Sequence, residues 1–216
     1  MNLTGKNVNF LGDSITQGVG VTSMEAHYTN LLRCRAKLGC VRNYGISGTR
    51  IARQRKLNVN ESAGETNSFV ERFADMDNNA DLVVVFGGIN DWAHGNAPFG
   101  SDENRTMDTF CGALHYLMKG LIEKYPAATI CFLTPLHMEG DTVPNVFNHL
   151  PLEAYVKKIK ETARRYSIPV LDLYGTSGIL PDIPAQKELY CPDGIHPNDR
   201  GNERIAERLQ AFLESL

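Results

Sequence analysis

Four short segments carry the residue types that acyl-transfer chemistry uses. They are Gly12-Asp13-Ser14, Ile46-Ser47-Gly48-Thr49, Gly88-Ile89-Asn90-Asp91 and Asp193-Gly194-Ile195-His196. Together they supply a hydroxyl, glycines that allow close backbone approach, a side-chain amide, a carboxylate and an imidazole. Acyl transfer needs a nucleophile, a base, a group that orients the base, and hydrogen-bond donors for an oxyanion. The sequence therefore holds every part of such a site, provided that the fold brings the segments together.

The elements that must position these segments follow from the spacing of the apolar residues. Strand-sized apolar runs occur at residues 8–11, 41–44, 82–86, 129–133 and 169–173. Amphipathic spacing predicts helices at residues 28–37, 69–76, 103–125, 152–166 and 199–216. This alternation predicts a flavodoxin-like, three-layer α/β/α sandwich with about five parallel strands. Ligands of such sheets bind at the carboxyl ends of the strands, which is where the four segments lie.

Length and composition limit the other possibilities. The chain has 216 residues, of which 42% are hydrophobic and 22% charged, and this fits one globular domain over residues 1–216. A net charge of −3 gives no general attraction to nucleic acid or to anionic membranes. The longest apolar run is far shorter than the ~20 residues of a membrane-spanning helix. The N-terminus lacks the pattern of a secretory signal, so we expect a cytoplasmic protein without membrane insertion. Its oligomeric state cannot be deduced from the sequence.

Cysteine spacing argues against a metal site. The five cysteines include no C-x-x-C pair, and no histidine stands at a companion spacing. We therefore expect no metal, and acyl transfer by the residues of the four segments needs no organic cofactor.

The ordered segments resemble the SGNH hydrolases, also called GDSL-type esterases and lipases. Gly12-Asp13-Ser14 matches the first family motif, Gly48 the second, Gly88-Ile89-Asn90-Asp91 the third and Asp193-Gly194-Ile195-His196 the last. All four occur in the family order, so the resemblance spans roughly the whole chain. The one departure is Ile15, which stands where the family name implies leucine.

The resemblance implies a role for each residue. Ser14 would attack the ester carbonyl, His196 would take and return the proton, and Asp193 would hold the imidazole in the required tautomer. The backbone N–H groups of Ser14 and Gly48 and the side-chain amide of Asn90 would form the oxyanion hole. The implied activity is that of a serine esterase acting on a small-molecule ester through an acyl-serine intermediate.

The substrate is less constrained than the reaction. Three polar loops, at residues 45–68, 91–102 and 135–151, can shape the pocket. Because they are not apolar lids, we expect short acyl groups, such as acetyl on a carbohydrate or another small alcohol. A lysophospholipase or an acyl thioesterase of the same family is the alternative.

Further residues are candidates for contact with the substrate. Asp13, Trp92 and His137 stand beside the motifs or at the end of the fourth predicted strand. A basic run is more typical of a solvated loop face, but it follows Gly48 and could meet an anionic part of a substrate. It comprises Arg50, Arg53, Arg55 and Lys56.

Each segment also has an interpretation without catalysis. Ser14 could cap a helix, and Asp193-Gly194 could be an ordinary turn. Asn90 would suit a loop after a buried strand, and Gly48 could serve only to permit a positive φ angle. The chain would then be a non-catalytic, flavodoxin-like ligand-binding module, with Ser14 far from His196. An inactive family member serving as an interaction surface is a third possibility.

Overall fold

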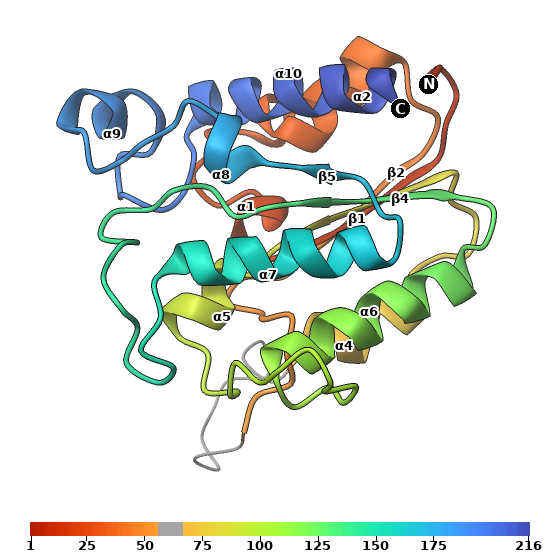
Figure 1. Ribbon diagram of the computed structural model, residues 1–216. Coiled ribbons are helices and arrows are strands. Elements are labelled where there is room, and N and C mark those ends of the chain that lie inside the picture. Colours follow the sequence, from red (N-terminus) through yellow and green to blue (C-terminus); the bar gives the residue numbers. More distant parts are fainter. Residues whose placement is uncertain (56–66) are drawn as a thin grey trace.

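The computed structural model describes residues 1–55 and 67–216. In this part of the chain, five strands form one parallel sheet in the order β2-β1-β3-β4-β5 (Figure 1). The strands are β1 (Val8–Gly12), β2 (Val41–Gly45), β3 (Leu82–Phe86), β4 (Thr129–Leu133) and β5 (Val170–Leu171). This strand order is that of flavodoxin-like sheets. The predicted α/β class and architecture are therefore confirmed.

Helices and short helical turns connect the strands and cover both faces of the sheet. They are α1 (Ser14–Gln17), η1 (Met24–Ala26), α2 (Tyr28–Ala36), α4 (Phe69–Arg72), η2 (Phe73–Asp75), α5 (Ile89–Ala93), α6 (Phe110–Lys124), α7 (Leu152–Arg165), α8 (Leu173–Thr176), α9 (Pro184–Tyr190) and α10 (Asp199–Ser215). In Figure 1, α2 and α10 lie above the sheet, and α4, α6 and α7 lie below it.

Three predicted elements differ from those observed by more than one residue. The helix expected at residues 69–76 is divided into α4 and the 3₁₀ turn η2. The helix expected from residue 103 begins only at Phe110, because the Thr109 side chain accepts a hydrogen bond from the Gly112 N–H and caps the helix there. The expected strand at residues 169–173 is reduced to the two residues of β5, because the Asp172 side chain accepts a hydrogen bond from the Gly175 N–H and caps α8, which begins at Leu173.

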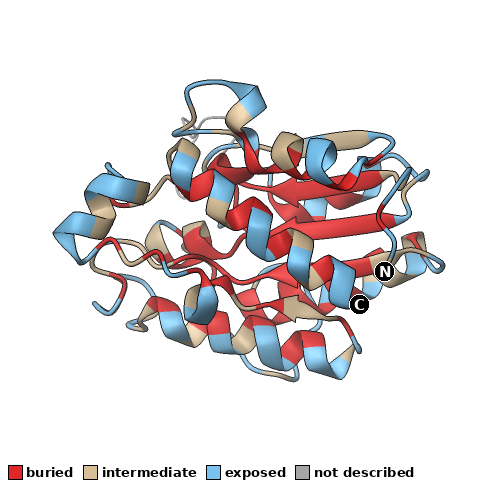
Figure 2. Ribbon diagram, turned by 90° about the horizontal axis from the view of Figure 1, so that it is seen from above, coloured by how far each residue is buried: buried red, intermediate tan, exposed pale blue. Residues whose placement is uncertain are grey.

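Both faces of the sheet are apolar because helices cover both. Successive side chains of a strand point to opposite faces. In β3, Leu82 and Val84 pack in the cluster that contains the apolar sides of α2 and α10. Val83 and Val85 pack in the cluster that contains α6 and α7. Figure 2 shows the buried strands between helices whose outer faces are exposed.

The strand register brings the predicted site segments to one edge. Gly12 at the end of β1 is level with Gly45 at the end of β2 and with Phe86 at the end of β3. The chain leaves β1 toward β2 and later returns to β3 on the other side, and ligands of such sheets bind at this switch point. The segments that follow these three strands, with α1 and α5 among them, lie at the same end of the sheet, on the left in Figure 1.

Candidate active site

Ser14 is the first residue of a short helix that packs directly on the ends of two strands. Asp13 caps this helix by accepting a hydrogen bond from the Ile15 N–H, so the capping role falls to Asp13 and not to Ser14. A Cβ atom at Gly45 would lie 2.2 Å from the Gln17 nitrogen. Only glycine at that position lets α1 come so close to β2. The helix thereby holds Ser14 at the carboxyl end of β1, where the residue is 8% exposed.

His196 reaches Ser14 from the far end of the chain. Its Nε2 atom lies 2.9 Å from the Ser14 Oγ atom, and its Nδ1 atom lies 2.7 Å from Oδ2 of Asp193. The other carboxylate oxygen, Oδ1, accepts hydrogen bonds from the backbone N–H groups of Ile195 and His196. Because a carboxylate can only accept, Nδ1 carries the proton and Nε2 is left to accept from the serine hydroxyl.

The charge on Asp193 is maintained by its neighbours. Partial burial alone would raise the pKa of this carboxyl, but hydrogen bonds from the backbone and ring of His196 and from the Ile195 N–H outweigh burial. The pKa of Asp193 is therefore lowered below its usual value. The carboxylate stays ionised and can stabilise a positive charge on the imidazole.

Gly48 and Asn90 lie in adjacent segments beside Ser14. The turn that carries Gly48 is joined to β1 by a hydrogen bond from the Ile46 N–H to the Gly12 carbonyl. Gly48 has φ +73°, and a Cβ atom there would meet no described protein atom within 4 Å. The positive φ angle, and not a close neighbouring atom of the described protein, thus explains why position 48 is glycine. The Asn90 Nδ2 atom donates to the Thr49 carbonyl at 3.1 Å, so the amide is fixed next to Gly48.

Residues 10–204 match the GDSL-like Lipase/Acylhydrolase family. The chain belongs to this family. The predicted resemblance is confirmed, and membership of a family of lipases and acylhydrolases supports carboxylic ester hydrolysis as the class of reaction.

Individual relatives agree with this placement of the GDSL-like chain. An acetylxylan esterase from Xylanibacter ruminicola is 25% identical over 218 residues, which cover 94% of this chain and 42% of that protein. The chain thus spans less than half of that relative's length. A crystal structure of a protein from Lactobacillus plantarum is 32% identical, with a TM-score of 0.85 and 98% of both chains covered. The crystal structure of the acetyl xylan esterase AlAXEase shares the fold, with a TM-score of 0.63, 20% identity, and 95% of this chain and 98% of that chain covered.

The three residues predicted to contact substrate lie in different surroundings in this GDSL-like protein. The Asp13 carboxylate is 2% exposed and lies beneath the site, facing its own helix. Trp92 is 8% exposed, and its indole N–H donates to the Leu150 carbonyl, so this ring anchors the loop before α7. Neither side chain offers much surface to a ligand.

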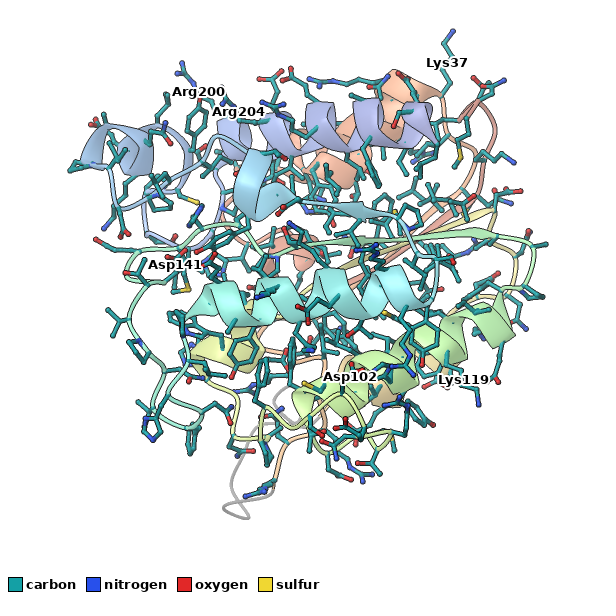
Figure 3. The ribbon with its side chains drawn as sticks, viewed as in Figure 1. Lys37, Asp102, Lys119, Asp141, Arg200 and Arg204 are labelled. Carbon is teal, nitrogen blue, oxygen red and sulfur yellow. The ribbon has the colours of Figure 1, made fainter. Side chains whose placement is uncertain are left out.

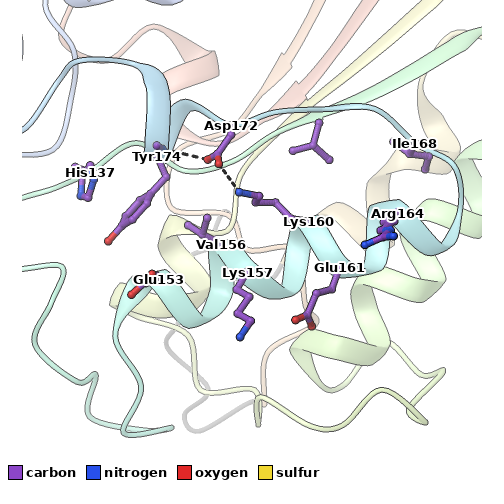
Figure 4. Close-up of a pocket in the computed structure, with 12 residues that line it drawn as sticks. His137, Glu153, Val156, Lys157, Lys160, Glu161, Arg164, Ile168, Asp172 and Tyr174 are labelled. Carbon is purple, nitrogen blue, oxygen red and sulfur yellow. Dashed lines mark hydrogen bonds and ion pairs between the residues drawn. The ribbon is translucent and has the colours of Figure 1, made fainter.

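His137 lies in the connection between β4 and α7. Its Nδ1 atom is 2.7 Å from Oδ2 of the buried Asp141, which Figure 3 labels. The His137 ring lies against Tyr174, with 3.7 Å between the ring centroids. Both rings line one end of a cavity of about 910 Å³ between α7 and β5, where Lys160 pairs with Asp172 (Figure 4).

The connection from β4 also contacts the turn that holds the base. The Glu139 N–H donates to the Gly194 carbonyl at 2.9 Å, and the Glu139 carboxylate pairs with Lys187 of α9 at 2.6 Å. Gly194 has φ +83°, and a Cβ there would lie 2.7 Å from Glu139 Oε2. This connection therefore holds the turn between Asp193 and His196 from the outside.

The side chains of Arg50 and Arg53 in the predicted basic run bind other parts of the protein. Arg50 donates to the His94 carbonyl, and Arg53 pairs with Asp108 at 2.7 Å. At Arg55 it is the backbone N–H that donates to Asn96 Oδ1. Lys56 lies outside the described residues, as do residues 57–66 of the loop at residues 45–68.

Within residues 1–55 and 67–216, no three His, Cys, Asp or Glu side chains cluster as a metal site would require. In the same part of the chain, no helix combines the length and apolarity needed to cross a membrane.

Two buried side chains of the GDSL-like site were missed from the sequence. Asp91 is 3% exposed and accepts hydrogen bonds from the Ile51 and Ala52 N–H groups. Burial raises the pKa of both Asp91 and Asp13 to about 7. Arg72 lies beneath the same segments and donates to the carbonyls of Gly12 and Tyr44. The position of Asp91 in the third motif could have indicated that it supports the site. No residue pattern around Arg72 indicates its contacts with Gly12 and Tyr44.

Proposed function

We propose that this GDSL-like protein is a serine esterase in which Ser14, His196 and Asp193 form the catalytic triad. The observation that carries the proposal is the pair of contacts at His196, 2.9 Å to the Ser14 Oγ atom and 2.7 Å to Asp193. These contacts match the nucleophile, base and orienting group of serine hydrolases. A ligand-binding module that lacks this chemistry has no need of an imidazole on the serine.

The reaction proceeds in two halves. In the first, the Ser14 Oγ atom attacks the ester carbonyl while His196 Nε2 takes the hydroxyl proton. The oxyanion accepts hydrogen bonds from the N–H groups of Ser14 and Gly48 and from the Asn90 amide. The intermediate then breaks its bond to the alcohol oxygen, and His196 returns the proton to this leaving group.

Water completes the cycle. The oxygen of a water molecule attacks the acyl-serine while His196 takes a proton from that water. The same three donors then hold the second oxyanion. Breakage of the bond between the acyl carbon and Ser14 Oγ releases the carboxylic acid, and His196 returns the proton to Ser14. The triad draws on both ends of the chain, so we propose that residues 1–216 act as one catalytic unit.

The proposed substrates are short-chain esters, in particular acetyl groups on carbohydrates or other small alcohols. The acetylxylan esterase relative, 25% identical over 94% of this chain, supports acetyl transfer to water. Lysophospholipids and long-chain acyl thioesters are the alternative substrates in the same family.

Two measurements test the proposal. A fluorophosphonate probe should label the wild-type protein and the Ser215→Ala control, but not Ser14→Ala. An unlabelled wild-type protein would overturn the triad and favour the ligand-binding module. A labelled Ser14→Ala variant would overturn the assignment of Ser14 as the nucleophile.

A series of p-nitrophenyl esters from acetyl to dodecanoyl, together with acetylated xylo-oligosaccharides, then tests the acyl preference. We expect kcat/KM to be highest for acetyl. A maximum at octanoyl or longer would favour the lysophospholipase or thioesterase alternative.

A further inference from the structure

Arg72 at the end of α4 lies under the first two of the four segments that carry the proposed site. Its side chain is buried, and its Nη2 atom donates to the Gly12 carbonyl at 2.6 Å and to Thr49 Oγ1 at 3.0 Å. Its Nη1 atom donates to the Tyr44 carbonyl. One guanidinium group therefore joins the end of β1, the end of β2 and the turn that follows β2.

Two of the three acceptors lie within two positions of a residue of the proposed oxyanion hole. Gly12 lies two positions before Ser14, and Thr49 directly follows Gly48. Thr49 Oγ1 also donates to the Ile46 carbonyl at 2.7 Å, which closes the turn around Gly48. The carbonyl of Thr49 accepts from the Asn90 side chain. Arg72 is thus linked to all three proposed oxyanion donors. Its contact with Gly12 leads to the Ser14 N–H, and its contact with Thr49 leads to the Gly48 N–H and to the Asn90 amide.

The charge on Arg72 persists in this position. Burial lowers the pKa of the guanidinium to about 10, and the nearby Asp13 carboxyl opposes that fall. The group is therefore protonated at neutral pH. The Phe69 ring, 4.9 Å from the guanidinium carbon, supports the planar group from one side. Lysine has no planar fork and cannot hold three acceptors in the same fixed geometry.

We propose that Arg72 is a positioning residue that sets the spacing of the oxyanion donors, acting through the Gly12 carbonyl and Thr49. The inference rests on the proposed esterase function. It goes further by assigning part of the transition-state stabilisation to a residue that cannot touch the substrate. Displacement of a catalytic group by a fraction of an ångström is costly, because the donors must fit the oxyanion and not the planar ester.

The test compares Arg72→Lys with Arg42→Lys. Arg42 also joins separate segments, because it donates to the Asn79 carbonyl and pairs with Asp77. It lies near the amino end of β2, whereas the proposed site lies at the carboxyl ends of the strands. We measure kcat and KM for p-nitrophenyl acetate, inhibition by an alkylboronic acid, and the melting temperature. The boronic acid forms a tetrahedral adduct on the serine, so its affinity reports the oxyanion hole directly.

Arg72→Lys should lower kcat by about 10- to 100-fold with little change in KM. Boronic acid affinity should fall in parallel with kcat/KM. Arg42→Lys should lower the melting temperature without lowering kcat or boronic acid affinity. If folded Arg72→Lys keeps wild-type kcat and inhibitor affinity, Arg72 only stabilises the fold and the inference is wrong.

A second pair of variants covers the case in which Arg72→Lys does not fold. Thr49→Val removes the hydroxyl that accepts from Arg72, whereas Thr49→Ser retains it. We expect Thr49→Val to lose kcat and boronic acid affinity together, and Thr49→Ser to stay near wild type. Equal activity of the two variants would overturn the inference. Activity of Ser14→Ala, by contrast, would overturn the proposed function itself, so the two failures are distinguishable.

Discussion

Substitution of Asp193 by asparagine and by alanine separates two functions of the carboxylate. Oδ2 lies 2.7 Å from Nδ1 of His196. Oδ1 accepts from the N–H groups of Ile195 at 2.9 Å and His196 at 2.7 Å. In Asp193→Asn, these two backbone donors hold the amide oxygen in the place of Oδ1. The amide NH₂ group must then face Nδ1, which becomes an acceptor, and the ring proton moves to Nε2.

The two variants should therefore differ in magnitude. A ring protonated at Nε2 cannot take the Ser14 proton, and this reversal costs about 10⁴ in kcat in serine proteases. Asp193→Ala loses a charge-assisted hydrogen bond worth ~1.5–3 kcal/mol, or about 10- to 160-fold in rate. The Asp193 side chain is 54% exposed, so water can enter the space and accept from Nδ1, which keeps the correct tautomer. We expect alanine to be the milder substitution.

The assay is kcat for p-nitrophenyl acetate, with circular dichroism to verify folding. Ser14→Ala supplies the background rate. Asp199→Asn is the matched control, because Asp199 accepts from Thr22 and makes no contact with the triad. An asparagine variant as active as the alanine variant, or more so, would refute the argument from the fixed amide orientation.

Three further changes test other parts of the site. Asn90→Ala should lower kcat by about 10²–10³-fold with KM nearly unchanged, and a change in KM alone would contradict an oxyanion role. Gly48→Ala places a Cβ at φ +73° and should lower the free energy of unfolding by ~1–2 kcal/mol in urea titrations; an unchanged midpoint would contradict this. Burial raises the pKa of Asp13 from 3.8 to about 7, so between these values the folded state holds a proton that the unfolded state has released, and rising pH destabilises the fold. The stability of Asp13→Asn relative to wild type should grow over this window by up to ~1.4 kcal/mol per pH unit, and a pH-independent difference would show that Asp13 does not titrate there.

The sequence predicted those elements that carry a distinct pattern of apolar residues, either a continuous run or an amphipathic repeat. The fully apolar run at residues 82–86 and the amphipathic residues of α7 and α10 are such cases. The start of α6 was wrong because the apolar spacing says nothing about the cap at Thr109. The helices α1, α5, α8 and α9 have four to seven residues, too few to show a period. Tertiary contacts, such as that of α1 with Gly45, decide where they form.

At the site, the motifs predicted which residues meet but not what lies beneath them. Ser14 and His196 belong to ordered motifs, so their proximity could be inferred. Arg72 makes its contacts with backbone carbonyls 28 and 60 positions away, and any residue type can supply a carbonyl. The side-chain pattern around Arg72 therefore could not reveal its partners. The raised pKa of Asp13 likewise depends on burial, which only the packed structure defines.

The 182 positions between Ser14 and His196 have a consequence for folding kinetics. Contacts of such long sequence separation are slow to form, because a long loop must close before they can contribute. In the proposed mechanism, a refolding chain has no activated serine until the segment that precedes α10 has docked on the sheet. Recovery of esterase activity should therefore lag behind the return of helical circular dichroism, and it gives a direct measure of when this last docking step occurs.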